Sequence, residues 1–196
     1  MNRNFVVSAL LAFAAAGAFA QTNTATTVQR DVNQQQRVEN GLQNGTLTTR
    51  EAAALEKEES KVDKMQSQAL KDGKLSDAER ARLQNAQNKV SKDIHTAKTN
   101  GVSGNPLSGS SQRMQADVQR DINQQKRVEQ GVQSGSLTNH EVGKLEKGEA
   151  KVDRKEARAG ADGHVGKREQ RRIQRSENKE SRKIFKEKHD AQERKG

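Results

Sequence analysis

The chain has 196 residues but contains no cysteine, tryptophan or tyrosine, and only one proline and four phenylalanines. The lack of cysteine excludes a lipoprotein anchor and disulfide bonds, so stability depends on aliphatic packing. No segment alternates polar and apolar residues, which argues against β-strands. Signatures of catalysis are missing as well, because the sequence has no nucleophile elbow, phosphate loop or zinc-binding spacing. We therefore expect an all-α protein that is not an enzyme.

Residues 1–20 have the organisation of a signal peptide. Arg3 supplies a positive charge, a short apolar stretch follows, and residues 18–20 (Ala-Phe-Ala) are typical of a cleavage site. The apolar stretch is too short to span a bilayer comfortably, and no stop-transfer segment follows it. We expect cleavage after Ala20 and a mature protein in the periplasm or outside the cell. Cleavage would leave Phe185 as the only aromatic residue and, by removing the charge of Arg3, lower the net charge from +10 to +9.

The chain repeats itself at a constant offset of 90 residues. Residues 28–63 align without a gap with residues 118–153, and 23 of these 36 positions are identical. Over the next 32 positions, 64–95 against 154–185, ten are identical. A tandem repeat of this kind predicts two copies of one supersecondary unit.

Glycine turns divide each copy into helices, and the four glycines are Gly45, Gly73, Gly135 and Gly163. A glycine that follows Asn, Asp or Ser favours the left-handed conformation that ends a helix. In the first three turns a Thr or Ser comes three residues later and a Glu three residues after that, at Thr48/Glu51, Ser76/Glu79 and Thr138/Glu141. This spacing is typical of a capping box at the start of a helix. Each turn therefore predicts a helix end followed at once by a helix start.

Apolar residues at helical spacing predict three helices in the first copy, over residues 26–42, 48–70 and 76–98. Short turns make successive helices antiparallel neighbours, so each copy is expected to be an up-down-up bundle. The segment between the copies holds the only proline among Gly, Ser and Asn, which is typical of a flexible linker. The predicted fold is all-α, a tandem duplication of a three-helix up-down-up unit joined by a flexible linker. Its parts are residues 1–20 (signal peptide), 21–98 (first repeat), 99–113 (linker), 114–190 (second repeat) and 191–196 (basic C-terminal tail).

The second copy has fewer apolar residues than the first. Lys155, Gly160, Ser176 and Glu180 stand where the first copy has Met65, Leu70, Ala86 and Val90. We therefore expect the second helix of this copy to fray near residues 159–161, and its third helix to dock weakly or stand free. The thin core also leaves self-association open, since the free energy gained by burying so few aliphatic side chains barely offsets the entropy lost on folding.

The glycine turns resemble the second half of the calcium-binding loop of the EF-hand family. That family has Asp or Asn at the fifth loop position, Gly at the sixth, an aliphatic residue at the eighth and Glu at the twelfth. The matching residues here are Asp72, Gly73, Leu75, Ser76 and Glu79. The resemblance implies a calcium site with ligands Asp72, Ser76 and Glu79.

The first half of that loop does not match. Gln68 and Leu70 stand where the family has its first and third carboxylates, and the capping box explains Ser76 and Glu79 without an ion. A second candidate metal site lies in the fourth turn, at Asp162, His164 and Glu169.

The sequence Leu-Thr-x-x-Glu, at residues 47–51 and 137–141, is similar to the L-T-x-x-Q repeat of small, helical periplasmic stress chaperones. Export, the lack of cysteine and the basic charge extend the resemblance. It implies a stress-protective protein that binds unfolded client proteins. The glycine-punctuated, proline-poor hairpins depart from that family, so its dimeric cradle is not carried over.

The last predicted helix has a basic stripe along one side. Most of its basic residues lie within about 40° of Arg168 at the helical period, with Arg171 and Lys183 at about 60°. Ile173 and Ile184 fall on the opposite side. The basic stripe consists of Arg168, Arg171, Arg172, Arg175, Lys179, Arg182, Lys183 and Lys186. Such a surface suits phosphate-rich polyanions, although a simply solvated face would have the same pattern.

Two functions from different classes follow from these features. The first is an exported binding or stress-protective protein of the cell envelope that uses its basic helical surface on polyanions or unfolded clients. The alternative is a protein that responds to a divalent metal, calcium, through its glycine turns. Sequence-specific binding of nucleic acid is not expected, because the basic stripe offers no aromatic residue for base stacking.

Overall fold

The structure, a computed structural model, describes residues 13–190, with side chains from Thr24 to Asp190. Within these residues it is all-α, as predicted, and contains no strand. The helices are α1 (Phe13–Gln43), α2 (Thr49–Ala69), α3 (Asp77–Thr99), α4 (Gly109–Ser134), α5 (Asn139–Ala159) and α6 (Lys167–Lys188). None of the helices in this part of the chain is both long and apolar enough to cross a membrane. Residues 1–12 of the predicted signal peptide and the predicted basic tail, 191–196, lie outside the described residues.

The helices begin and end where the turn chemistry predicts. Thr48, Ser76 and Thr138 are the N-caps of α2, α3 and α5, and each forms its capping box. At Thr48, for example, the backbone N–H donates to Glu51 Oε2 at 2.9 Å, and the side-chain oxygen accepts from the Glu51 N–H at 3.2 Å. The four turn glycines have φ between 77° and 89°, which confirms the predicted left-handed helix ends. α1 differs from the prediction, because it starts at Phe13 rather than near residue 26.

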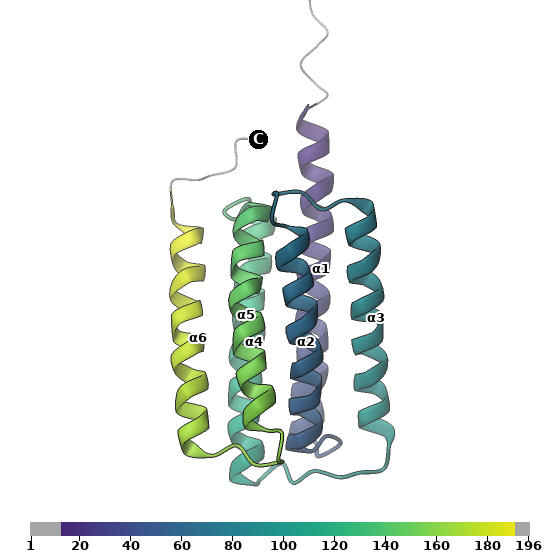
Figure 1. The fold of residues 1–196 in the computed structure, drawn as a ribbon, viewed down its shortest axis with the longest axis vertical. Coiled ribbons are helices and arrows are strands. Elements are labelled where there is room, and N and C mark those ends of the chain that lie inside the picture. The colour runs from purple at the N-terminus through teal and green to yellow at the C-terminus, as the bar shows by residue number, and fades with distance from the viewer. Residues whose placement is uncertain (1–12, 191–196) are drawn as a thin grey trace, which may run out of the picture.

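The helices form one bundle in which the two halves of the chain pack against each other (Figure 1). α2 packs against α5, and α1 against α4, more extensively than any helix packs within its own half. α3 covers α1 and α2, while α6 covers α4 and α5, so α3 and α6 form the two outer edges in Figure 1. We call α1–α3 the first half and α4–α6 the second half.

Apolar residues of both halves share two hydrophobic clusters. One cluster joins the end of α1 and the start of α2 to the start of α4 and the end of α5, through residues such as Leu42, Ala53, Met114 and Val152. The other cluster joins residues such as Val28 and Leu70 to Leu145 and Ile184. Neither half therefore has an apolar core of its own.

Small residues allow α2 and α5 to approach closely. A Cβ at Gly143 would lie 3.0 Å from Leu70 Cβ, and a Cβ at Gly160 would lie 2.7 Å from both Ala53 Cβ and Met114 Cε. Gly160 occupies the position equivalent to Leu70, so the large and small partners are exchanged between the two ends of this interface.

The prediction that the last helix docks weakly or stands free is wrong. Ile173 and Ile184 are 1% and 0% exposed, and α6 packs against both α4 and α5. One polar replacement that suggested a weak core is accommodated by a smaller partner. Glu180, in place of Val90, lies directly over Gly148, where any Cβ would overlap its carboxylate. α5 ends at Ala159, the position equivalent to Ala69 at the end of α2.

The segment between the halves follows a defined path against the first turn. The Gly104 N–H donates to Gly45 O at 2.8 Å, and a Cβ at Gly104 would overlap Leu47 O. Ser108 caps α4 through an N–H of Ser111, so this helix begins at Gly109, inside the predicted linker.

Candidate metal centre

Charge is distributed unevenly between the interior and the surface of this basic protein. Fifteen of its 26 acidic residues are buried, whereas no lysine or arginine between Thr24 and Asp190 is buried. The buried acids are Asp31, Glu39, Glu56, Glu59, Asp63, Asp117, Asp121, Glu129, Glu141, Glu146, Glu149, Asp153, Glu156, Glu177 and Glu180. A buried carboxylate is strongly destabilised unless it is protonated, hydrogen-bonded, or paired with a cation. The interior of the bundle therefore needs positive charge or protons that its own basic residues do not supply.

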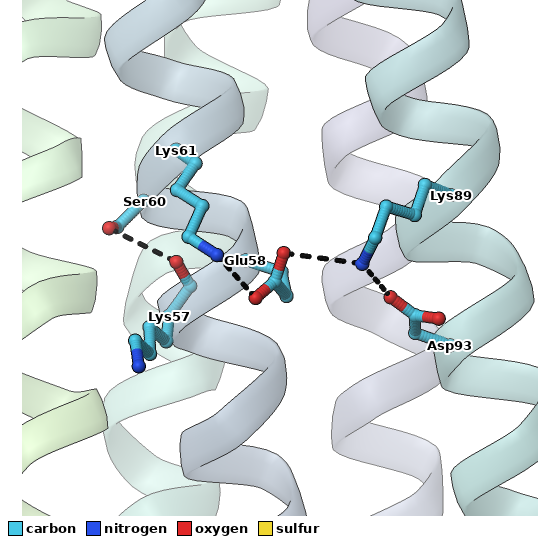
Figure 2. Close-up of polar contacts among 6 residues, drawn as sticks. All are labelled: Lys57, Glu58, Ser60, Lys61, Lys89 and Asp93. Atoms are coloured by element: carbon cyan, nitrogen blue, oxygen red, sulfur yellow. Dashed lines mark hydrogen bonds and ion pairs between the residues drawn. The ribbon is translucent and has the colours of Figure 1, made fainter.

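A carboxylate at the surface shows the usual solution to this problem. Glu58 lies between two lysines in Figure 2, with Lys61 Nζ at 2.6 Å and Lys89 Nζ at 3.4 Å from its oxygens. Lys89 also contacts Asp93 at 2.6 Å. These lysines hold the pKa of Glu58 below its usual range, although its partial burial acts in the opposite direction.

Helical spacing directs the buried acids to the interface between the halves. Glu56, Glu59 and Asp63 lie at intervals of three and four on α2, next to the buried Leu55 and Val62. α5 repeats this pattern with Glu146, Glu149, Asp153 and Glu156. Residues at these intervals share one face of a helix, so the faces that bring α2 and α5 together carry both aliphatic and acidic side chains.

Four acids of the second half form a cluster that we call the four-carboxylate site: Asp117 and Asp121 from α4, Glu156 from α5, and Glu177 from α6. Oxygens of Asp121, Glu156 and Glu177 all lie within 4.8 Å of one another. Asp117 is not part of this converging group, but its charge acts on all three. Glu156 is 0% exposed, and neither of its oxygens has a hydrogen-bond donor among the described residues. Arg120 lies at the edge of the site, with its Nε 3.0 Å from Glu177 Oε2, and its charge, like that of Arg113, also acts on Asp117.

At the equivalent positions, the first half fills the same space with uncharged side chains around a single carboxylate. Asp31, equivalent to Asp121, accepts hydrogen bonds from the side-chain amides of Gln66 and Gln87, the latter at 2.6 Å. Gln87 Nε2 also donates to the backbone oxygen of Thr27 at 3.0 Å. Thr27, Gln66 and Gln87 correspond to Asp117, Glu156 and Glu177. The second half therefore has three carboxyl groups where the first half has a hydroxyl and two amides.

Burial raises the pKa of these groups. It raises the pKa of Glu56 and Asp117 to about 7 and that of Glu177 to about 8, and removal from water is the largest cause in each. The pKa of Asp31 is also about 7, although the amides of Gln66 and Gln87 act to lower it. Glu156 has a pKa well above its usual value because of burial and, after that, the charges of nearby carboxylates, Asp121 first. At neutral pH these groups must share protons or bind a cation.

A second group of carboxylates connects the two halves. Oxygens of Glu56, Asp121 and Asp153 also lie within 4.8 Å of one another, so Asp121 belongs to both groups. All three residues are at most 2% exposed. Beside them lie Glu59 and Glu149, whose oxygens have no hydrogen-bond donor among the described residues. The pKa of Glu149 is raised well above its usual value by burial and by the charge of Asp121.

The metal ligands predicted in the glycine turns are used for local structure. Glu79 Oε2 accepts from the Ser76 N–H at 3.0 Å and from its hydroxyl at 2.5 Å, while Asp72 Oδ1 accepts from the Lys74 N–H at 3.0 Å. In the fourth turn, Asp162 Oδ1 accepts from the His164 N–H at 2.8 Å, and Glu169 Oε2 accepts from the Gly166 N–H at 2.8 Å. Within the described residues, neither of these two turns brings three or more potential ligand atoms close together.

The basic stripe of α6 faces away from the bundle. Seven of its residues are exposed and Lys183, which contacts Glu180 at 2.6 Å, is half-buried. The structure thus leaves this surface accessible, on the side of α6 opposite Ile173 and Ile184.

Sequence reasoning missed the buried acids because charged residues on an amphipathic helix are normally assigned to solvent. One signal was present: five pairs of buried acids are identical at the offset of 90 residues, namely Asp31/Asp121, Glu39/Glu129, Glu56/Glu146, Glu59/Glu149 and Asp63/Asp153. They recur beside the apolar positions rather than opposite to them.

Comparison with known proteins adds no identification. None of the family models, curated proteins or solved structures compared with the chain matches it.

Proposed function

We propose that this protein binds multivalent metal cations at the four-carboxylate site in the interior of its helical bundle. One observation carries the proposal. In the first half, side-chain amides donate hydrogen bonds to Asp31. In the second half Asp117, Glu156 and Glu177 lie around Asp121, and Glu156 has no hydrogen-bond donor among the described residues. As anions without a cation, these three carboxylates destabilise the fold, since an unpaired buried charge costs several kcal/mol, on the order of 3–5.

The chemistry of the ligands favours a hard cation. All of them are carboxylate oxygens, which suit Ca²⁺, Mg²⁺ and Mn²⁺ rather than the metals that prefer thiolate or imidazole. Three oxygens within 4.8 Å of one another all lie within about 2.8 Å of a common point. This upper limit admits both the Ca²⁺–oxygen distance of about 2.3–2.6 Å and the Mg²⁺–oxygen distance of about 2.0–2.1 Å. The arrangement therefore fits a hard divalent cation of either size.

The direct test copies the first-half arrangement into the second half. In the triple variant Asp117→Thr, Glu156→Gln, Glu177→Gln, the three carboxylates become the residues found at positions 27, 66 and 87. Metal-stripped protein, titrated with Ca²⁺ and Mn²⁺ in a calorimeter and counted by native mass spectrometry, should lose one bound ion per chain in this variant. The fold should be retained, because the first half already accommodates the same residues at equivalent positions.

Glu58→Gln is the matched control, because Glu58 is a surface carboxylate that two lysines already neutralise. This control variant should bind as many ions as the parent. A parent protein that binds neither ion, or a triple variant that binds as many ions as the parent, would rule out the proposal.

If the signal peptide predicted from the sequence is cleaved, this activity belongs in the cell envelope, as a store or sink for cations or as a protein stabilised by them. We also propose that the two halves arose by tandem duplication, which the 23 identical positions among 36 support. On this view the amide network and the four-carboxylate site descend from one ancestral position and diverged in charge.

Binding of envelope polyanions by α6 is the second candidate function. Its support is that the seven exposed residues of the basic stripe lie on the face of α6 that packing does not use. Affinity for a polyanion should be electrostatic, so that log K falls by close to one unit of slope in log salt concentration for each phosphate contacted. Replacing Arg168, Arg172, Arg175 and Arg182 with Gln should reduce the slope by about three to four units. Equal binding by this variant and the parent at low salt would make the stripe a solvated face.

A further inference from the structure

The second carboxylate group, Glu56, Asp121 and Asp153, differs from the first in where its ligands originate. Glu56 comes from α2 in the first half, whereas Asp121 and Asp153 come from α4 and α5 in the second half. Each residue is almost completely buried, and each has one oxygen without a hydrogen-bond donor among the described residues: Glu56 Oε1, Asp121 Oδ2 and Asp153 Oδ2. The other oxygen of Glu56 is held by Gln35 Nε2 at 2.9 Å, which fixes the orientation of the carboxylate.

We propose that the bundle binds two cations side by side, with the Asp121 carboxylate as a ligand shared between the four-carboxylate site and a second site formed by Glu56, Asp121 and Asp153. This inference rests on the proposed cation-binding function and specifies how many ions the site takes. It also assigns the second ion a structural consequence, because that ion would bridge α2 to α4 and α5.

The geometry of Asp121 supports a shared ligand. Asp121 belongs to both groups, and in each group the ligand oxygens lie within 4.8 Å of one another. A carboxylate with two oxygens can coordinate one ion through each, and two ions about 3.5–4 Å apart are typical of sites with shared ligands. Among the described residues, Asp121 Oδ1 accepts a weak hydrogen bond from Gln124 Nε2 at 3.5 Å, and Glu156 can donate to Asp121 only while it carries a proton, which a cation would replace.

Charge balance supports two ions rather than one. The two groups together contain six carboxylates: Glu56, Asp117, Asp121, Asp153, Glu156 and Glu177. With all six ionised, a single divalent ion would leave four negative charges in the interior, which protons would have to remove. Two divalent ions leave two negative charges, and Arg120 beside Glu177 and Arg113 near Asp117 act on these. Unbalanced charges cost much more free energy in the interior than at the surface. The negative charge that remains after one ion is bound therefore favours the binding of a second ion.

The first half again provides a comparison. Glu146, the counterpart of Glu56, accepts from Gln125 Nε2, but the neighbouring Asp31 is occupied by the amides of Gln66 and Gln87. Of the residues equivalent to Glu56, Asp121 and Asp153, only Glu146 has an oxygen without a hydrogen-bond donor among the described residues, and no adjacent cation site is available to share. The second site is expected only at the end of the bundle that contains Asp121.

Counting bound ions tests the proposal. Metal-stripped mature protein is loaded with Mn²⁺ and examined by native mass spectrometry and electron paramagnetic resonance. The parent should hold two ions per chain and show the spectrum of an exchange-coupled pair. Glu56→Gln should hold one ion, in the four-carboxylate site, and show the hyperfine pattern of isolated Mn²⁺. Glu177→Gln should also hold one isolated ion, in the site formed by Glu56, Asp121 and Asp153. Asp121→Asn should lose the exchange coupling whatever its ion count.

The outcomes separate this inference from the function on which it rests. A parent that binds no ion overturns both. A parent that binds one ion, which Glu56→Gln leaves unchanged and the second-half triple variant removes, overturns the two-ion inference while leaving the proposed function intact. Two ions with uncoupled spectra would also overturn it, because a shared carboxylate transmits exchange. Far-ultraviolet circular dichroism of each variant shows that it is folded, and Glu58→Gln controls for the loss of a carboxylate.

Discussion

The carboxyl groups of the core each have a counterpart at an offset of 90 residues, and the differences between counterparts carry most of the functional argument. Asp31 and Asp121 occupy equivalent positions in the two halves. Asp31 accepts hydrogen bonds from amides, whereas Asp121 faces Glu156 and Glu177. An amide and a carboxylate have almost the same shape. The exchange therefore changes charge and hydrogen bonding while leaving packing nearly constant.

This exchange predicts that removing the carboxylates stabilises the metal-free protein. Glu156→Gln with Glu177→Gln should raise the free energy of unfolding by about 1–4 kcal/mol at pH 8 in the presence of a chelator, since amides can donate to Asp121 and carry no charge. Urea denaturation followed by circular dichroism measures the change. Glu58→Gln, which removes an exposed ion pair, should alter the same quantity by less than about 1 kcal/mol. Destabilisation by the double replacement would mean that protonated carboxyl groups already satisfy one another.

Residues whose roles are local were predictable from the sequence. Thr48, Ser76 and Thr138 act within three residues of their capping partners, so their spacing was sufficient. The ligand oxygens of Asp121 and Glu56 meet only because α4 and α2 come from different halves of the chain. Nothing in the local pattern distinguishes such an acid from a solvated one.

At the scale of the helices, compensation between neighbours explains why α6 docks despite its polar sequence. The first half pairs Glu58 with Val90, while the second half pairs Gly148 with Glu180 at the same two positions. Loss of a side chain on α5 creates the space that the longer side chain on α6 fills. The sequence showed the loss of Val90 and suggested a weak contact, but the matching glycine could be interpreted only once α5 and α6 were seen to face each other.

This pairing predicts strong coupling between Gly148 and Glu180. Gly148→Ala alone should destabilise the protein by about 1–3 kcal/mol, because the new methyl group overlaps the Glu180 carboxylate. In the Glu180→Val background, which restores the residue of the first half, the same change should cost less than about 0.5 kcal/mol. Chemical denaturation of the four members of this double-mutant cycle measures the coupling. Additive effects would show that Glu180 moves aside without cost.

For the whole molecule, the acidic interior makes the stability of the metal-free protein depend on pH. Asp31, Glu56 and Asp117 have a pKa of about 7 in the folded protein and Glu177 one of about 8, whereas in the unfolded chain such groups titrate near their ordinary values of 3.8 and 4.5. The folded state therefore binds more protons than the unfolded state between about pH 4 and 8, and its stability falls as pH rises through this range.

The melting temperature of chelator-treated protein should accordingly be higher at pH 5 than at pH 8. Because cations replace the protons, adding Ca²⁺ should raise it most at pH 8 and least at pH 5. Scanning calorimetry at these two pH values, with and without Ca²⁺, checks both statements. A metal-free protein that melts at a higher temperature at pH 8 would show that the core acids are stabilised as anions by some other means.

The fold class and the limits of α2 and α3 could be predicted from the sequence, because helical periodicity and capping act over short distances. The way in which the halves combine could not. The prediction of two compact three-helix units followed from short turns, which determine only that successive helices are neighbours. The dominant contacts, α2 with α5 and α1 with α4, depend instead on small residues such as Gly143 and Gly160, whose partners lie far away in the sequence.

These contacts predict that half of the chain is not an independent folding unit. A fragment of residues 21–108 would expose the faces of α1 and α2 that pack on α4 and α5, including the acids Asp31, Glu56, Glu59 and Asp63. It should show weak helicity without a cooperative melting transition when dilute. Mixing it with the fragment of residues 105–196 should restore the helicity of the intact chain.

The fragment of residues 21–108 is also expected to associate with itself under some conditions. Since 23 of 36 aligned positions are identical in the two halves, a second copy of the fragment can occupy the place of α4–α6. That homodimer would bring Glu56, Glu59 and Asp63 of both copies together without the four-carboxylate site. Light scattering after size-exclusion chromatography should therefore detect the dimer at pH 5, where these acids are protonated, and not at pH 8. Ca²⁺ should fail to restore it at pH 8, because Asp31 is closed by Gln66 and Gln87. A fragment that melts cooperatively as a monomer would instead show that α1–α3 carry a complete core.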